Sequence, residues 1–326
     1  MLTAMDRATP NARKGYLLAV LAAVLFCGNG VASREVLDAG LSSVQLSGLR
    51  TLITAIGLFL WLLLRDRSAI QVRRFDAPRL LAFGVAGLAL VNFSYFVAIK
   101  RLGVGVGLTL EYMGPILLLV WLRVRYQRVV PVRVWAAAAL ALGGCFLVVE
   151  GWKFASLDAL GLAAGASAAI GFAVYAWGGE RSGHSGYKPG TTLLWMSISA
   201  TLVWFAIDPP WNWDWTLITS GWNGLASLYV GLVGTLGGFI AAFAAVRFIP
   251  AARASVIMTL EPALAALIAW PVLGEVLSPA QVIGGAVVLG AVMWIQLQRT
   301  AGPEEQAPPF QTTDSHAGNF SDQPLG

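Results

Sequence analysis

The stretch RLGVGVGLTLEYMGP (101–115) is the most informative part of the chain, because a related stretch, RFIPAARASVIMTLEP (247–262), occurs later in the same chain. Both are mostly apolar, both carry Thr-Leu-Glu, and a proline follows each glutamate within four residues. An ionised side chain in hydrocarbon costs about 2.5–3.5 kcal/mol, so acidic residues in such segments are rare. The two matched carboxyls, Glu111 and Glu261, therefore indicate an internal repeat.

The composition around these stretches is that of a membrane protein. Of the 326 residues, 57% are hydrophobic and 12% are charged, whereas soluble domains carry about 25% charged residues. Runs such as LITAIGLFLWLLL (52–64) lack the alternation of a membrane β-barrel. We therefore predict an all-α membrane protein with ten transmembrane helices, each of about 20 residues. The expected spans are 15–33, 44–64, 79–99, 103–122, 131–149, 159–177, 190–206, 222–245, 252–270 and 279–297.

Positive charges predict the orientation of the spans. If the chain starts in the cytoplasm and crosses ten times, seventeen Lys and Arg residues lie on the cytoplasmic side and four on the outer side. This bias follows the positive-inside rule, so we expect the plasma (inner) membrane with both termini cytoplasmic. The basic loops on the cytoplasmic side account for the net charge of +5, so this charge does not indicate a nucleic-acid partner, and none is expected. The first span also resembles a signal peptide, but its apolar run is longer than usual and nine spans follow.

The internal repeat extends over most of the chain. ALALGGCFLVV (139–149) resembles VIGGAVVLGAV (282–292), and the first and sixth spans both open with Gly-led, Ala-rich stretches. Chance likeness between apolar helices is the alternative. Because five spans are an odd number, the second copy must enter the membrane from the opposite side, and such inverted repeats support alternating access in secondary transporters. The predicted divisions are a cytoplasmic segment (1–14), two five-span repeats (15–150 and 151–298) and a disordered cytoplasmic tail (299–326).

The two glutamates are candidates for chemistry in the middle of the membrane. Each lies about nine residues into its span, roughly 14 Å deep in a hydrocarbon core of about 30 Å. Such a carboxyl could carry a proton or bind a substrate amine, or it could be a structural group at a helix break. Pro115 and Pro262 predict such breaks, because neither can donate to the carbonyl four residues earlier, that of Glu111 or of Met258.

Other polar and aromatic side chains lie within the expected spans. Arg50, in the outer third of the second span, either snorkels to the outer interface or is a charge partner for Glu111 or a substrate carboxylate. The remaining residues either form helix–helix hydrogen bonds or line a substrate cavity. Besides the two glutamates, the candidate substrate-binding residues are Asn29, Asn92, Tyr95, Tyr112, Tyr175, Tyr229 and Thr259.

Signatures of catalysis and of metal binding are missing from the sequence. Two cysteines and two histidines build neither a disulfide framework nor a histidine-rich metal site. The chain has no P-loop, zinc-protease motif or esterase elbow. We therefore expect no catalytic residue, no metal and no cofactor.

The longest run of familiar sequence is TLEPALAALIAWPVLGEVLSPAQVIGGAVV (259–288). Together with GLTLEYMGP (107–115), it resembles the EamA-like branch of the drug/metabolite transporter superfamily, and within it the threonine/homoserine exporters. The resemblance covers about residues 15–298. It implies an inner-membrane exporter of amino acids or similar metabolites, driven by an ion gradient. It also implies a central cavity surrounded by spans one, three, four, six, eight and nine, with spans five and ten at the periphery.

The residues and the resemblance together predict a secondary transporter that exports small metabolites by alternating access. Amino acids such as threonine or homoserine are the expected substrates, the lipid bilayer is the surroundings, and a proton is the candidate coupling ion. An aromatic amino acid or drug exporter of the same superfamily is the alternative. A membrane-embedded enzyme or a non-transporting receptor would represent a different class.

Overall fold

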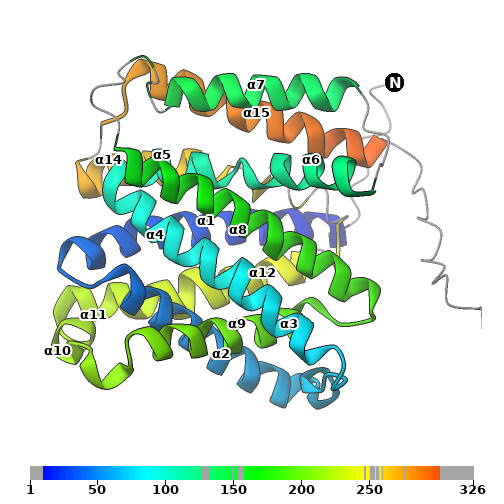
Figure 1. Ribbon diagram of the computed structural model, residues 1–326, viewed down its shortest axis with the longest axis vertical. Coiled ribbons are helices and arrows are strands. Elements are labelled where there is room, and N and C mark those ends of the chain that lie inside the picture. The colour runs from blue at the N-terminus through cyan, green and yellow to red at the C-terminus, as the bar shows by residue number, and fades with distance from the viewer. Residues whose placement is uncertain are drawn as a thin grey trace, which may run out of the picture.

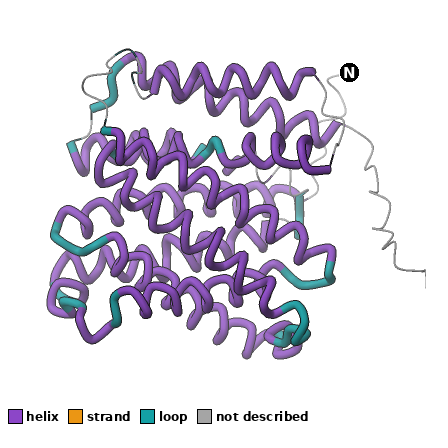
Figure 2. Tube along the Cα trace, in the orientation of Figure 1, coloured by secondary structure: helices purple, strands orange, loops and turns teal. Residues whose placement is uncertain are grey.

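The computed structural model describes residues 10–126, 132–148, 150, 152, 158–245, 247–249, 254, 257–258, 260–274 and 276–301. Every regular element in these ranges is a helix, and loops connect the helices (Figure 2). This confirms the predicted all-α fold class. Most of the predicted N-terminal segment (1–14) and of the predicted tail (299–326) lies outside the described ranges.

The first half of the chain forms long helices, of which two are interrupted. The third expected span contains a π-helical segment, η2, and the fourth is broken between α5 and α6. The elements are α1 (Pro10–Asp38), α2 (Ser43–Arg65), the short η1 (Arg67–Ile70), α3 (Ala77–Phe83), η2 (Gly84–Ala89), α4 (Leu90–Leu102), α5 (Val104–Glu111), α6 (Gly114–Tyr126) and α7 (Val132–Val148).

The second half of the chain also consists of helices, some of them interrupted. Its third helical stretch also contains a π-helical segment, η5. The elements are α8 (Ala159–His184), α9 (Pro189–Ile207), the short η4 (Pro210–Asn212), α10 (Trp215–Thr219), α11 (Gly221–Leu228), η5 (Tyr229–Gly237), α12 (Gly238–Ala245), α14 (Glu261–Leu273) and α15 (Pro279–Ala301).

Seven described helical stretches are long and apolar enough to cross a membrane. Two shorter apolar helices, Trp135–Val148 and Pro279–Ala291, coincide with the fifth and tenth expected spans. The ninth expected span lies partly outside the described ranges, and its later part forms α14. The seven long stretches are Arg13–Asp38, Ser43–Arg65, Ala77–Leu102, Val104–Arg125, Ala159–His184, Pro189–Ile207 and Gly221–Ala245.

Local sequence signals set the helix ends. Ser42 and Gln45 form a reciprocal capping box at the start of α2, and the Asp158 side chain accepts the Gly161 amide at the start of α8. Gly103 adopts φ +86° between α4 and α5, a backbone conformation that only glycine adopts readily. The chain can therefore reverse tightly between these two helices.

The helices lie side by side in layers (Figure 1). The α7 and α15 pair forms one edge of the molecule, followed by α5, α6 and α14, while α2 lies at the opposite edge beside α9. Extensive interfaces join α7 with α15, α4 with α8, α2 with α9, and α1 with α12. The beginning of α1 and the end of α15 lie at the same end of the bundle (Figure 1).

Burial is reversed relative to a soluble protein. Asn29 and Asn92 are buried inside the bundle, whereas Leu17, Leu202 and Trp270 are more than 60% exposed. A soluble surface rarely exposes so many large apolar side chains. The outer surface is therefore suited to lipid, and the polar side chains are reserved for the interior.

Candidate functional site

A small polar cavity lies between five helices, α1, α2, α4, α5 and α14. Its volume of about 40 Å³ accommodates a few water molecules, because one water needs roughly 10–15 Å³. Six residues predicted from the sequence face this one cavity. The lining consists of Phe26, Asn29, Arg50, Val91, Asn92, Tyr95, Leu108, Glu111 and Glu261.

The two glutamates enter the cavity from helix ends. Glu111 is the last residue of α5, and Glu261 is the first residue of α14. Pro115 is the second residue of α6, and Pro262 is the second residue of α14. At both positions the proline lies in the first turn of its helix, where its missing amide hydrogen interrupts no hydrogen bond within that helix.

Tyr112 connects the two halves of the chain at the cavity. Its hydroxyl oxygen lies 2.9 Å from a carboxyl oxygen of Glu261 and 2.9 Å from the carbonyl oxygen of Met258. The sequence suggested Tyr112 as a substrate ligand. In the structure its hydroxyl is engaged with the start of α14.

Arg50 points into the bundle and does not snorkel to an interface. Its Nε donates to the Thr235 hydroxyl oxygen over 2.9 Å, and its guanidinium lies 5.6 Å from the centre of the Phe96 ring. Within the described ranges it forms no ion pair with Glu111 or Glu261, so it shares their cavity without pairing directly with either.

Thr235 is the residue that sequence reasoning missed. Its hydroxyl oxygen accepts hydrogen bonds from Arg50 and from the Asn29 side chain (2.8 Å), and its proton goes to the Val230 carbonyl over 2.6 Å. Thr235 lies in η5, and π-helical segments often occur at functional sites. The available signal was a lone hydroxyl in the glycine-rich run GLVGTLGG (231–238).

Asn29 is fixed by several hydrogen bonds. Besides its bond to Thr235, its amide nitrogen donates to the Val230 carbonyl over 3.2 Å, and its amide oxygen accepts from Ser33 over 3.1 Å. Asn29 therefore orients Thr235, which in turn orients Arg50. The three residues form a chain from α1 through η5 to α2.

Two candidates, Tyr175 and Tyr229, lie outside the lining of the small cavity. Tyr175 packs edge-on against Phe172, with ring centres 6.3 Å apart, and the Tyr229 hydroxyl donates to the Leu25 carbonyl over 3.3 Å. Thr259 lies outside the described residues.

The chain matches the model of the EamA-like transporter family twice, over residues 13–150 and 159–297. It belongs to the EamA-like transporter family. The chain is therefore a multi-pass membrane transporter by family and not an enzyme.

Named relatives and a solved structure agree with this family. The threonine/homoserine exporter RhtA of Escherichia coli (strain K12) is 28% identical over 219 residues, 66% of this chain and 69% of the relative. The uncharacterized inner membrane transporter YicL of Salmonella typhimurium (strain LT2) is 24% identical over 88% of this chain and 96% of its own. A crystal structure with 18% identity superposes with a TM-score of 0.60, covering 89% of this chain and 99% of the other, which supports the fold.

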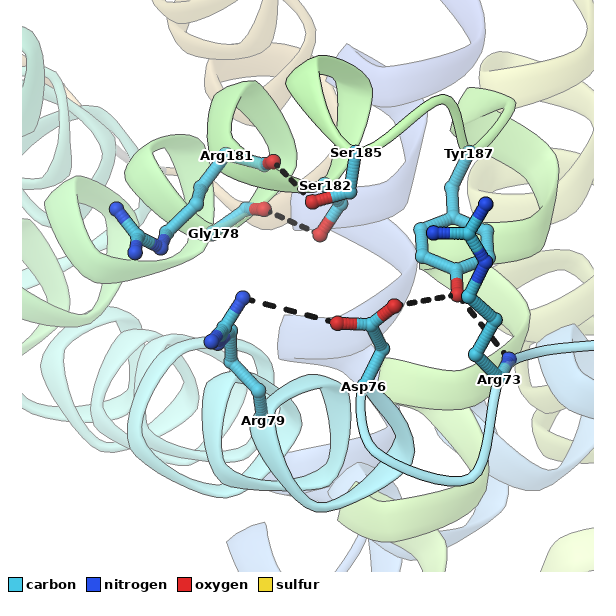
Figure 3. A network of polar contacts seen from close by, with 8 residues as sticks. All are labelled: Arg73, Asp76, Arg79, Gly178, Arg181, Ser182, Ser185 and Tyr187. Atoms are coloured by element: carbon cyan, nitrogen blue, oxygen red, sulfur yellow. Dashed lines mark hydrogen bonds and ion pairs between the residues drawn. The ribbon is translucent and has the colours of Figure 1, made fainter. Parts of the chain in front are cut away.

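Polar contacts tie the helices of this transporter together where α2 ends and α9 begins. The Lys188 amine donates to the Asp66 carboxylate, and the Tyr187 hydroxyl donates to Asp76 over 2.8 Å. Tyr187 also accepts the Arg73 amide over 3.1 Å. Figure 3 shows the contacts of Tyr187 with Asp76 and Arg73, between the start of α3 and the turn joining α8 to α9.

A second tether lies at the other end of the same two helices. Asp208, the residue that follows α9, accepts from the Gln45 side chain near the start of α2 over 2.9 Å. Asp66 likewise follows α2 and holds Lys188, which precedes α9. We call Asp66–Lys188 and Asp208–Gln45 the end tethers. Each of the two helices is thus held at both ends by the other.

Proposed function

We propose that this transporter exports small polar amino acids of the threonine or homoserine type. The observation that carries the proposal is one cation, Arg50, and two carboxyls, Glu111 and Glu261, around a single internal cavity. An amino acid carries both charges. Its carboxylate would be recognised by the guanidinium, and its ammonium group by a glutamate. The named exporter relatives support this substrate class.

The proposed architecture is ten spans arranged as two inverted five-span repeats. In such an arrangement an interface between two spans has a counterpart between the equivalent spans. The α4–α8 interface corresponds in this way to the α1–α12 interface, and α6–α8 to α1–α14. The π-helical segments η2 and η5 occupy the third span of each half, and two family matches divide the chain at the same place.

Transport would proceed by alternating access. The cavity of about 40 Å³ is far below the roughly 300 Å³ of common ligand pockets. A cavity of this size is too small for an amino acid, so substrate entry requires helices to separate. A proton is the proposed coupling ion, because two carboxyls face a cavity large enough for water.

The proposed orientation places the Asp66–Lys188 tether in the cytoplasm. Arg73, Arg79 and Arg181 gather at that end of the bundle (Figure 3). Lys188 lies next to Tyr187 and pairs with Asp66, so this end carries the positive charges that the positive-inside rule places in the cytoplasm. Both chain ends would then be cytoplasmic, in the plasma (inner) membrane.

An efflux screen tests the function. Cells expressing the transporter are loaded with labelled threonine, homoserine, phenylalanine and a cationic drug, and initial efflux is compared with empty cells. We expect faster efflux of threonine or homoserine. Preferential efflux of phenylalanine or of the drug would favour the alternative exporters, and unchanged efflux of every amino acid would contradict the proposal.

A matched pair of variants tests the site. Glu111→Gln removes a cavity carboxyl, whereas Glu180→Gln makes the same change near the end of α8, where Glu180 faces His184. We expect Glu111→Gln to reduce efflux at least about tenfold, the effect of losing one charged contact, and Glu180→Gln to retain it. Both proteins must be present in the membrane at equal amounts. Equal rates would remove Glu111 from the site.

A further inference from the structure

The Tyr112 hydroxyl serves two acceptors with a single proton. The Glu261 carboxyl oxygen and the Met258 carbonyl oxygen both lie 2.9 Å from its oxygen. A phenol has one O–H to donate, although its oxygen can also accept. The hydroxyl can therefore donate fully to only one of the two oxygens.

The Met258 carbonyl needs this donor because of Pro262. In a regular helix that carbonyl would accept the amide of residue 262, and proline has no amide hydrogen. A carbonyl left without a partner at membrane depth is costly unless another group or water reaches it. Tyr112, which comes from the other half of the chain, supplies the partner.

The protonation state of Glu261 decides where the Tyr112 proton goes. An ionised carboxylate only accepts hydrogen bonds, so Tyr112 must donate to it, and the Met258 carbonyl loses its donor. When Glu261 takes up a proton, its new O–H donates to the Tyr112 oxygen. Tyr112 then donates to Met258, and all three groups are satisfied.

We propose that Tyr112 is a positioning residue that couples the protonation state of Glu261 to the hydrogen bonding of the backbone just before α14. This proposal rests on the proposed function, because it identifies Glu261 as the carrier of the coupling proton. Binding of one proton tightens the tie between the two halves at Met258. Loss of that proton frees the backbone just before Pro262, where α14 begins.

Of the two cavity carboxyls, only Glu261 is hydrogen-bonded to Tyr112 in the described residues, so its protonation is the one to which Tyr112 can respond. Arg50 is occupied by Thr235, and the Cys27 thiol donates to the Val24 carbonyl. In the part of the chain that the structure describes, no hydrogen bond reaches the Glu111 carboxyl. The ionisable groups that face Glu261 or its neighbours are Cys27 from α1, Arg50 from α2, Tyr95 from α4, Glu111 and Tyr112 from the fourth span, and Tyr175 from α8.

Hydrogen exchange of the full-length protein in lipid nanodiscs tests the proposal. The amides of residues 260, 261 and 263–268 are followed across a pH series, after correction for intrinsic exchange. In the wild-type protein we expect exchange at the start of α14 to rise with pH by about five- to tenfold, the effect of one lost hydrogen bond. Absence of such a step would overturn the proposal.

Two variants separate the proposal from a general loss of stability. In Glu261→Gln the side-chain amide donates to Tyr112 at every pH, so we expect slow, pH-independent exchange. In Tyr112→Phe we expect faster exchange without a step. Tyr187→Phe removes a hydroxyl from the network of Figure 3 and should keep the wild-type step. A wild-type step in Tyr112→Phe or in Glu261→Gln would contradict the proposal.

Infrared spectroscopy supplies a second measurement. The carbonyl band of a protonated carboxyl should grow as the pH falls, disappear in Glu261→Gln and shift in frequency in Tyr112→Phe. An unshifted band would show that Tyr112 does not read this proton. A normal pH step without amino acid efflux would refute the proposed substrate alone, whereas efflux without a step would refute the proton relay alone.

Discussion

Arg50 supplies the positive charge of the cavity, and its neighbours fix its direction. Nε of Arg50 donates a hydrogen bond to the Thr235 hydroxyl oxygen, and the Phe96 ring centre lies 5.6 Å from the guanidinium carbon. A guanidinium is a planar fork that matches a carboxylate, whereas a lysine amine is a point charge. The residue is therefore suited to recognising the carboxylate of an amino acid.

Replacement of Arg50 should abolish most transport. We expect Arg50→Gln to lower initial threonine efflux at least about tenfold, and Arg50→Lys to recover only part of the loss because the fork is missing. Arg67→Gln is the control, since Arg67 lies outside the cavity and donates to the Leu63 carbonyl. Wild-type efflux by Arg50→Gln, at equal membrane levels, would exclude Arg50 from substrate recognition.

Single residues were predictable where their chemistry is unusual for a membrane. Charged and amide groups in apolar spans were evident from the sequence, and Asn29, Arg50 and Glu111 line the cavity. Thr235 was not evident, because a threonine in a helix commonly bonds to its own backbone. The faces of Tyr175 and Tyr229 depend on how helices pack, which residue type does not reveal.

At the scale of elements, the π-helical segment η2 packs closely against α9 through a glycine. A Cβ on Gly84 would lie 1.8 Å from the Ser199 hydroxyl and 2.5 Å from the Met196 carbonyl oxygen. The hydroxyl can rotate away, but the backbone carbonyl cannot. The close approach of these two elements therefore depends on glycine at this position.

Gly84→Ala should lower thermal stability. Forcing extra volume into a packed interior costs about 1–3 kcal/mol, so the melting temperature in detergent should fall. Gly179→Ala is the matched control, because no atom lies within 4 Å of a Cβ built there. Equal melting temperatures for the two variants would show that the η2–α9 contact is not tight.

The Asp66–Lys188 tether should respond only to strong acid. The Lys188 amine, with the Ser68 hydroxyl, holds the pKa of Asp66 at about 2, below the ordinary value of about 3.9. A lowered pKa means that this stabilisation is complete above about pH 4 and is lost as the pH falls toward 2. The proposed proton coupling, if it operates near neutral pH, would therefore use other groups.

Melting curves as a function of pH test the tether. We expect the wild-type melting temperature to decrease between about pH 4 and pH 2. The decrease over this pH range should be smaller in Lys188→Gln. Lys100→Gln, an exposed substitution at the opposite end of the bundle, serves as the control. An identical acid response in Lys188→Gln would show that the pair does not contribute.

Elements were predictable where hydropathy alone defines them. Seven of the ten expected spans coincide with long described helices, because about 20 apolar residues suffice to cross a bilayer. The π-helical segments η2 and η5 were not foreseen, since both lie in uninterrupted apolar sequence. Their register is set by contacts with α9 and α2, which lie far away along the chain.

At the scale of the whole molecule, the proposed orientation can be tested by labelling. In a background carrying Cys27→Ser and Cys145→Ser, we expect Ser220→Cys to react with an impermeant maleimide on intact cells. Ser185→Cys, at the opposite end of α9, should react only after the membrane is opened. Reaction of both positions from outside would contradict the orientation derived from the positive charges.

The proposed duplication could be inferred from the sequence because both halves contain the Thr-Leu-Glu triplet. The contacts between the two halves could not be inferred from the sequence. Tyr112 meets Met258 across the molecule, and no local pattern identifies that partner. Such pairings arise only when the two halves fold against each other.

The end tethers have a mechanical consequence for transport. Sliding of α2 along α9 would break one of the two end tethers, because they lie at opposite ends of the helix pair. The two helices are therefore expected to move together as one rigid unit. We expect any movement that admits substrate to be a rotation about the α2–α9 pair. The helices farthest from this pair would then be displaced most.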